Sequence, residues 1–250
     1  MVKTLVLRVE GTNAEEEMIH SFKLSGSEVD IVHVNDIVSR KKSLEDYQIL
    51  VFPGGFAHGD DVSAGKILAN ILKYKIWKDL TKFIDSGKLV IGVCNGFQAI
   101  TKAGLLPAIG GIGVQECTLT SNDSGYFIDK WVELKHASGN KCVFTKNLRD
   151  EMFVPINHGE GKFVATPEII QKLEDNGQIV FRYSQNPNGS INDIAGICNS
   201  QGNVFGMMPH PEKYFSKYMH PFWTRMKDMN EEGDGLQLFK GAVDYAKKKL

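Results

Sequence analysis

The chain has 250 residues, a formal net charge of -1, 42% hydrophobic residues and 24% charged residues. This composition is typical of a globular protein, and the small net charge provides no electrostatic basis for binding nucleic acid or an anionic membrane. No apolar run approaches the ~20 residues that cross a bilayer, and the N-terminal residues lack the pattern of a signal peptide. We therefore expect no nucleic-acid partner and no membrane partner.

The first half of the chain alternates apolar strand patterns with amphipathic helix patterns. The predicted strands are residues 4–9, 28–34, 48–52 and 88–93. The predicted helices are residues 15–24, one long amphipathic helix within 62–86, and residues 97–106. Strands that alternate with helices indicate an α/β fold with an open, mostly parallel sheet flanked by helices. In such sheets ligands bind beyond the carboxyl ends of the strands.

The second half of the chain changes to short strands joined by turn-rich links. The predicted strands are residues 114–120, 126–136, 142–145, 153–156, 163–165, 178–183, 194–199 and 204–207, and a helix over 236–248 ends the chain. This pattern favours an antiparallel extension of the parallel sheet. The charged and aromatic segment 213–235 has no predicted chemical role. We find no linker or internal repeat, so residues 1–250 are predicted to form a single domain.

Cysteine usage indicates the cellular compartment. The four cysteines lie at irregular spacings and form no C-x-x-C pair: Cys94, Cys117, Cys142 and Cys198. This spacing is untypical of a zinc site or a disulfide framework, so we expect no metal. Unpaired cysteines predict a reducing compartment, the cytoplasm.

The segment 89–98 has the layout of a nucleophile elbow. A buried-strand pattern ends at Gly92, and Cys94 and Gly96 follow immediately before a helix pattern. In an elbow the reactive side chain occupies a tight strand-to-helix turn that has no room for side chains at the flanking positions. A cysteine there lies at a helix N-terminus, which favours the thiolate. The alternative interpretation is a buried structural cysteine between two closely packed glycines.

A cysteine nucleophile needs a base, and the base needs an orienting group. His210-Pro211-Glu212 provides both, because the prolines at 209 and 211 favour an extended backbone in which residues two apart share a side. His158-Gly159-Glu160 has the same spacing, but glycine does not favour an extended chain. We therefore favour His210 as base and Glu212 as its orienting group, over His158 and Glu160 or a surface turn.

An oxyanion hole would complete the site. In an elbow enzyme one donor is the backbone N–H after the nucleophile, here that of Asn95, and a second comes from a loop after a neighbouring strand. The turn Pro53-Gly54-Gly55-Phe56 follows the predicted strand 48–52, and its two glycines allow backbone N–H groups to face a substrate. These parts together predict acyl transfer through a thioester.

The motifs around these residues resemble the class I glutamine amidotransferases. They are Pro53-Gly54-Gly55-Phe56, Gly92-Val93-Cys94-Asn95-Gly96-Phe97-Gln98 and Pro209-His210-Pro211-Glu212. Further stretches are similar to the branch that forms the glutaminase subunit of phosphoribosylformylglycinamidine synthase: Gly11-Thr12-Asn13, segment 155–161, Asn186-Pro187-Asn188-Gly189-Ser190, segment 194–197 and segment 202–208. The resemblance covers nearly the whole chain and implies a flavodoxin-like α/β fold.

The resemblance also implies a role for each site residue. Cys94 would attack the side-chain amide of glutamine, His210 would protonate the departing ammonia, and Glu212 would orient His210. Gly55 and Asn95 would hold the oxyanion. The residues implied in glutamine binding are Gly54, Gln98, Asn157 and His158.

The implied partner is a separate synthetase subunit that uses ammonia and ATP to convert formylglycinamide ribonucleotide into the amidine. A small third subunit is expected as well. The chain itself would need no cofactor, since ATP and Mg²⁺ would bind to the synthetase. The remaining alternatives are a glutaminase of another amidotransferase complex, a non-catalytic regulatory relative, and a cysteine hydrolase of a related elbow fold.

Five positions depart from the family's usual pattern. Glu10 and Ala14 replace a proline and a cysteine around Gly-Thr-Asn, Ala57-His58 replaces Ser-Tyr, and Asn157 occupies a position where alanine is common. The segment 213–235 is also longer than usual. None of these positions belongs to the predicted triad, so the departures concern partner contacts and loop detail.

Overall fold

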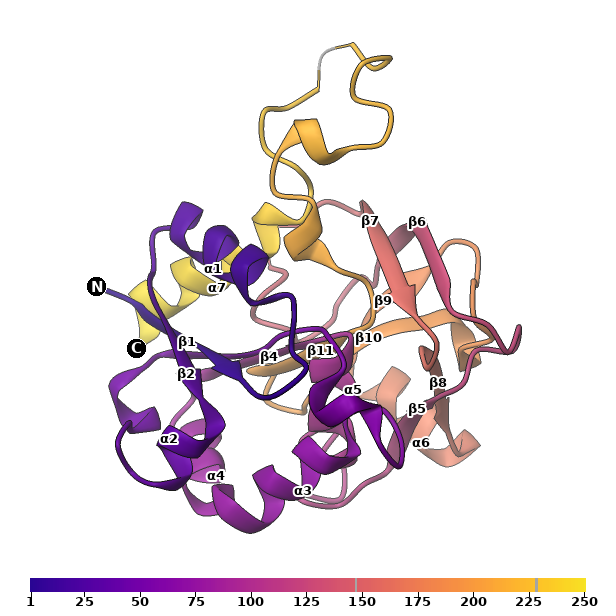
Figure 1. The fold of residues 1–250 in the computed structure, drawn as a ribbon. Helices are drawn as coiled ribbons and strands as arrows, with labels where there is room; N and C mark the ends of the chain where they lie inside the picture. The colour runs from indigo at the N-terminus through magenta and orange to yellow at the C-terminus, as the bar shows by residue number, and fades with distance from the viewer. Residues whose placement is uncertain (147, 228) are drawn as a thin grey trace.

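A mixed sheet runs through the middle of the molecule (Figure 1). The computed structural model describes residues 1–146, 148–227 and 229–250, and within them nine strands have the order β2-β1-β3-β4-β11-β10-β9-β6-β7. The parallel half consists of β1 (Lys3–Arg8), β2 (Glu28–His33), β3 (Ile49–Phe52), β4 (Leu89–Val93) and β11 (Val204–Met207). The antiparallel half consists of β10 (Ile194–Cys198), β9 (Ile179–Tyr183), β6 (Ile128–His136) and β7 (Glu151–His158). The predicted α/β fold with an antiparallel extension is confirmed.

Helices cover both faces of the parallel half. Figure 1 shows α1 (Glu15–Leu24) and α7 (Leu236–Lys249) on one face, and α2 (Val34–Val38), α3 (Lys66–Lys75), α4 (Trp77–Asp85) and α5 (Asn95–Lys102) on the other. All five residues of β4 are buried, as expected for a central parallel strand enclosed on both sides. Helix α6 (Pro167–Asp175) lies beside a two-stranded sheet of β5 (Cys117–Thr120) and β8 (Lys162–Ala165), all three labelled in Figure 1.

The predicted helix over 62–86 is wrong as a single helix. The chain forms α3 and α4, which meet at Ile76, a buried residue with a non-helical φ of -128°. Helix α3 begins directly after Gly65, which has a φ of +72°. A Cβ on Gly65 would lie 2.6 Å from the backbone nitrogen of Ala99, so glycine permits the close approach of α3 to α5.

Two other predicted elements differ from the structure, and two helices were not predicted. Residues 142–145 form a turn rather than a strand, because the side chain of Asn140 accepts hydrogen bonds from the backbone N–H of Cys142 (3.0 Å) and from the Thr145 hydroxyl (3.1 Å). The strand predicted over 114–120 begins only at Cys117. Helix α6 was not predicted, although Thr166 caps it and Pro167 begins it, a recognised signal for a helix start. Helix α2 was not predicted either.

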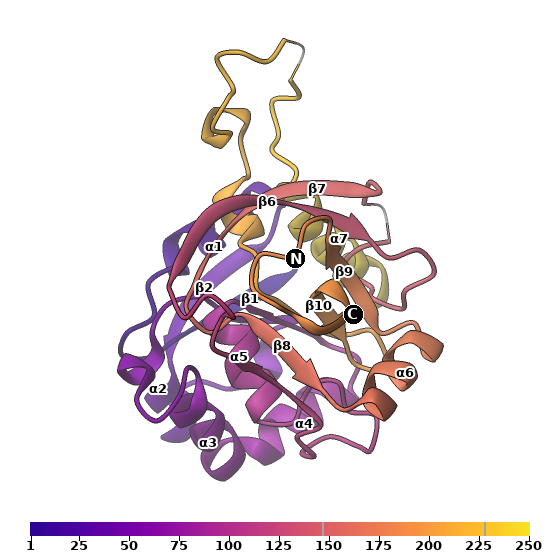
Figure 2. The same cartoon turned by 90° about the vertical axis from the view of Figure 1, so that its right-hand side faces the viewer.

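The segment that follows the last strand projects from the body of the molecule (Figures 1 and 2). We call its described residues 214–227 and 229–235 the arm. Ser216 and Glu232 pair across its base. Its first residue, Tyr214, packs edge-on against Trp131 of β6, with ring centroids 5.4 Å apart. Among the described residues, no helix has the length and apolarity needed to cross a membrane.

Candidate active site

Cys94 occupies the tight turn between β4 and α5, as predicted. Its φ is 52° and its ψ is -109°, a conformation that costs a residue other than glycine ~1–3 kcal/mol. Neighbouring glycines allow this turn, since a Cβ on Gly96 would lie 1.9 Å from the carbonyl oxygen of Phe52 and one on Gly92 would lie 2.8 Å from the backbone of Gly96. The structure therefore has the geometry of a nucleophile elbow.

His210 and Glu212 form a buried pair next to Cys94. The Nδ1 atom of His210 lies 2.5 Å from Oε1 of Glu212, and the two residues are 1% and 0% exposed. The extended backbone expected here is wrong from Pro211 onward, because residues 211–213 form a 3-10 turn. The pairing is retained because this turn folds the Glu212 carboxylate back onto the imidazole. A Cβ added to Gly54 would lie 2.8 Å from the His210 ring and 3.5 Å from the Cβ of Cys94, so both residues border Gly54.

The charges in this cluster favour a protonated histidine. Burial lowers the pKa of His210, but the neighbouring Glu212 carboxylate and Cys94 side chain raise it to about 10. Since Nδ1 faces Glu212, the second nitrogen, Nε2, is available to Cys94. Nε2 is buried and has no hydrogen-bond partner among the described residues. The histidine can therefore exchange a proton with a group bound at Cys94.

The predicted oxyanion donors lie on two segments that meet at Cys94. Asn95 is the first residue of α5, where a backbone N–H has no partner inside the helix. Gly55 has a φ of +141° and packs so closely on residues 11–13 that an added Cβ would lie 2.7 Å from the carbonyl oxygen of Gly11. The neighbouring groups of this turn are engaged, since the Phe56 N–H donates to Gly11 (2.8 Å) and the Gly54 carbonyl accepts from Asn13 (3.2 Å). The Gly55 N–H forms no backbone hydrogen bond among the described residues.

Side chains of the nucleophile helix hold the surrounding loops. The Asn95 amide accepts from the Ala57 N–H at 2.9 Å and donates to Asp60 at 2.8 Å. The Gln98 amide lies 3.0 Å from the Asn95 amide nitrogen and donates to the Glu160 carbonyl at 2.6 Å. Gln98 is thus bonded at both ends, which makes it suited to shaping the site. Its direct contact with glutamine stays a prediction.

The competing His158–Glu160 pair does not form. The Glu160 carboxylate accepts from the Ala64 N–H at 3.2 Å and lies 3.7 Å from the Lys102 ammonium. His158 is bonded instead to Asn122, with Nδ1 and Oδ1 3.1 Å apart. The neighbouring Asn157 lies at the nucleophile, since its carbonyl oxygen is 3.8 Å from the Cys94 sulfur. The structure thus brings the 157–158 segment to Cys94 but leaves His210 as the only histidine there with a carboxylate partner among the described residues.

Two of the departures from the family pattern lie together. Nδ1 of His58 lies 3.5 Å from the Glu10 carboxylate, and the His58 backbone N–H donates to the Glu10 carbonyl at 2.7 Å. Glu10, in place of the usual proline, and His58, in place of the usual tyrosine, therefore contact each other. The contact supports the turn that holds Gly55.

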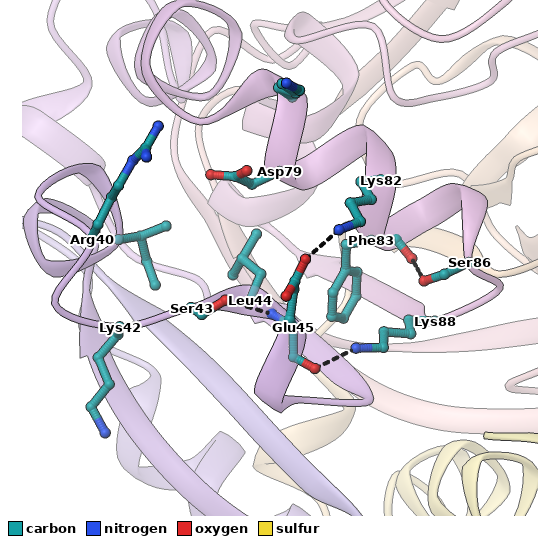
Figure 3. A pocket seen from close by; sticks show the side chains of 12 residues that line it. Arg40, Lys42, Ser43, Leu44, Glu45, Asp79, Lys82, Phe83, Ser86 and Lys88 are labelled. Carbon is teal, nitrogen blue, oxygen red and sulfur yellow. Dashed lines mark hydrogen bonds and ion pairs between the residues drawn. The ribbon is translucent and has the colours of Figure 1, made fainter.

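An open pocket lies away from this cluster. It has a volume of about 730 Å³ and is lined by residues of α4 and of the segment 37–45 (Figure 3). Lys88, which lines it, precedes β4, whereas Cys94 follows the carboxyl end of the same strand. Two lysines of this pocket donate hydrogen bonds to Glu45 (Figure 3): Lys82 to its carboxylate and Lys88 to its backbone carbonyl. In residues 1–146, 148–227 and 229–250, no group of three or more His, Cys, Asp and Glu side chains is arranged to hold a metal ion.

Comparison with known proteins identifies the family of the chain. Residues 1–246 match the model of the CobB/CobQ-like glutamine amidotransferase domain. The chain belongs to this glutamine amidotransferase family. The match extends over both halves of the sheet and over the described residues of the arm.

Other amidotransferases show the same relationship over their full length. The chain is 42% identical to the phosphoribosylformylglycinamidine synthase subunit PurQ of Dehalococcoides mccartyi, with 99% of this chain and 98% of that protein covered. It is 41% identical to the subunit of the same name from Methanococcus maripaludis, with 98% of each covered. The structure of PurLQS from Thermotoga maritima contains a chain 30% identical, with a TM-score of 0.78 and 98% of each covered. A glutamine amidotransferase from Thermotoga maritima, 16% identical with a TM-score of 0.57 over 98% of this chain and 97% of that one, shows the same fold.

Several buried residues around the site were not predicted. Asn122 and Lys102 are polar, 3% and 6% exposed, and bonded to the loops that surround Cys94. Asn122 belongs to a turn-rich stretch in which asparagine is expected for local reasons. No pattern in the sequence relates it to His158, 36 positions away.

Proposed function

We propose that this chain is the glutaminase subunit of phosphoribosylformylglycinamidine synthase, and that Cys94 is its nucleophile. The observation that carries the proposal is the elbow cysteine beside a buried His210–Glu212 pair, in a chain that matches PurQ subunits from end to end. A nucleophile, a base and an orienting group at such positions are the parts required for acyl transfer.

In the first half of the reaction, the Cys94 thiolate attacks the side-chain carbonyl carbon of glutamine. The carbonyl oxygen becomes negative and is held by the backbone N–H groups of Gly55 and Asn95. The tetrahedral intermediate collapses when the carbon–nitrogen bond breaks and Nε2 of His210 gives its proton to the leaving nitrogen. Ammonia departs, and the glutamyl group stays on Cys94 as a thioester.

In the second half, water replaces ammonia. His210, now neutral, takes a proton from the water, and the resulting hydroxide attacks the thioester carbon. The carbon–sulfur bond breaks, glutamate leaves, and the proton on His210 restores the starting pair. The raised pKa of His210 supports this cycle, because the resting site already holds the proton that ammonia requires.

The remaining predicted contacts with glutamine are part of the same proposal. Gly54 borders both Cys94 and His210, so it has the position of a backbone contact to the substrate. Asn157 and His158 lie at the end of β7, where the Asn157 carbonyl approaches the Cys94 sulfur. Gln98 would act from the opposite side by holding the Glu160 carbonyl.

The ammonia would pass to a synthetase subunit that converts formylglycinamide ribonucleotide into formylglycinamidine ribonucleotide. The names of the PurQ relatives support this partner, since each is a subunit of that synthase. ATP and Mg²⁺ would bind to the synthetase, and a small third subunit would complete the assembly. The pathway is de novo purine biosynthesis.

A cytoplasmic location fits the same proposal. The four cysteines are buried and unpaired, as expected in a reducing compartment.

Labelling with a glutamine-mimicking diazoketone tests the nucleophile. We expect one label on each chain, located on Cys94, formed more slowly when glutamine is added and absent in Cys94→Ala. Cys117→Ala is the matched control, because Cys117 is equally buried at 5% exposure and should not affect labelling. Labelling of another residue, or no protection by glutamine, would contradict the proposal and favour a hydrolase or a regulatory relative.

A further inference from the structure

Asn122 has all its side-chain hydrogen-bonding capacity in use beside the candidate active site. It lies in the turn between β5 and β6 and is 3% exposed. Its amide nitrogen donates to the carbonyl oxygens of Tyr126 (2.9 Å) and His158 (2.8 Å). Its amide oxygen accepts from the Gly161 N–H at 3.1 Å and lies 3.1 Å from Nδ1 of His158.

These contacts determine which ring nitrogen of His158 carries the proton. The two carbonyls accept only, so the Asn122 nitrogen must face them, and the Gly161 N–H donates only, so the Asn122 oxygen must face it. That oxygen can only accept from Nδ1 of His158. His158 is therefore protonated at Nδ1, and its Nε2 carries a lone pair.

The lone pair on Nε2 of His158 is buried without a hydrogen-bond partner among the described residues. Burial, together with the positive charge of His210, lowers the pKa of His158 to about 4, so the ring stays neutral at physiological pH. The flanking carboxylates do not offset this effect. Asp123 is paired with Lys162, and Glu160 is directed toward Lys102 and Ala64. The remaining ionisable groups of the cluster, Cys94 and Glu212, are engaged with His210.

We propose that Asn122 is a positioning residue of the glutamine site, which fixes His158 in the tautomer that presents an unprotonated Nε2 as a hydrogen-bond acceptor. The inference rests on the proposed function. An acceptor at this place fits an N–H donor of the substrate, which is either the side-chain carboxamide or the α-ammonium group of glutamine. A protonated ring would instead offer a donor and would repel the ammonium group.

Asn122→Asp changes this arrangement with almost no change of shape. The carboxylate still accepts from Nδ1 and from Gly161, but its charge favours the imidazolium form of His158. We expect KM for glutamine to rise about tenfold at pH 7, consistent with the loss of one hydrogen bond to a charged or polar group. We expect kcat to change less, and KM to return toward the wild-type value as the pH rises and His158 loses its extra proton.

Asn203→Asp is a matched control. Asn203 is also 3% exposed and donates to two backbone carbonyls, those of Ile84 (2.9 Å) and Lys88 (3.0 Å), at the amino end of β4. It should lose stability in the same way but keep the wild-type dependence of KM on pH. A change in KM that is the same in both variants would overturn the inference, as would wild-type KM at every pH in Asn122→Asp.

Nitrogen chemical shifts of the histidine rings provide a second readout on the unmodified chain. We expect the Nδ1-protonated tautomer for His158 in the wild type, and a larger imidazolium fraction at pH 7 in Asn122→Asp. An Nε2-protonated tautomer in the wild type would refute the inference even if the variant does not fold. This measurement needs no turnover, so it separates failure of the inference from failure of the proposed function, which a wild-type complex inactive with glutamine would reveal.

The two candidate donors of the substrate are distinguished by the diazoketone, which has the α-ammonium group but no carboxamide N–H. If labelling of Cys94 is also slower in Asn122→Asp, His158 accepts from the ammonium group. If only glutamine turnover is affected, it accepts from the carboxamide. Either result supports the inference, and an effect on neither overturns it.

Discussion

Glu212 is 0% exposed, and its one ionic partner among the described residues is His210. A buried carboxylate is costly unless it is paired, and here it lies against Nδ1 of His210. The pair could be predicted from His-Pro-Glu alone, because a spacing of two brings the side chains together. The 3-10 turn that achieves this could not, since proline is compatible with both backbones. Asn122 was missed because its partner is distant in the sequence.

The pH dependence of stability tests the His210–Glu212 pair. The pKa of His210 is raised to about 10 in the folded chain, against about 6.5 unfolded. The folded state therefore binds more protons between these values, so the stabilisation is complete below pH 6.5 and is lost as the pH rises through 10. In Glu212→Gln the free energy of unfolding should fall less steeply from pH 7 to pH 10 than in the wild type.

Urea unfolding at several pH values measures this slope. Glu168→Gln is the control, because Glu168 is an exposed helix-start carboxylate whose pKa is lowered by hydrogen bonds to its own backbone and to Thr166. Glu168 changes its charge only at acid pH. Above pH 7 the free energy of unfolding of Glu168→Gln should therefore depend on pH with the same slope as that of the wild type. Equal slopes for Glu212→Gln and the wild type would contradict a charged pair.

At the scale of elements, the contact between β3, β4 and α5 determines where the nucleophile lies. Gly92 is paired with Phe52 of β3 and Gly206 of β11, and Gly96 lies against the Phe52 carbonyl. The strand, the turn and the glycines could be predicted, because apolar runs and tight turns are local signals. The break at Ile76 could not, because tertiary burial overrides the local helical pattern there. The turn at 142–145 was mistaken for a strand because its residues are apolar, whereas the Asn140 side chain bonds Cys142 and Thr145.

Gly96→Ala is expected to destabilise the chain. The new Cβ would lie 1.9 Å from the Phe52 carbonyl oxygen, so α5 must move away from β3. Overpacking of this kind costs ~1–3 kcal/mol and more when backbone must shift, so we expect at least about 3 kcal/mol in urea unfolding. Gly159→Ala is the control, since its Cβ would meet only Phe127 at 3.9 Å. Equal stability of the two variants would show that α5 does not need the close approach.

At the scale of the whole molecule, the candidate active site lies where the parallel half of the sheet meets the antiparallel half. Cys94 follows β4, and His210 follows β11, the last strand of the parallel half. The His210 N–H also donates to the Pro155 carbonyl of β7 at 2.8 Å, which connects the parallel half to the antiparallel half. Sequence patterns predicted both halves but not their junction, because strand order depends on contacts between distant segments.

The arm is the other feature of the whole molecule that patterns did not predict. It exposes aromatic side chains, including Phe222 at 50% and Trp223 at 41% exposure. The arm begins two residues after Glu212, and a Cβ on Gly235, its last residue, would lie 1.9 Å from the Pro211 carbonyl oxygen. The segment that orients His210 is therefore enclosed by both ends of the arm.

The most direct test of the account is amidine formation by the reconstituted synthase with two nitrogen donors. The chain would be combined with its synthetase and third subunit, ATP, Mg²⁺ and formylglycinamide ribonucleotide, and supplied with either glutamine or ammonium chloride. We predict that the wild-type complex uses both donors, and that the Cys94→Ala complex uses ammonium at an unchanged rate but loses glutamine-dependent activity by a factor of at least about 10⁴. Glutamine-dependent amidine formation that persists in Cys94→Ala would contradict the central claim.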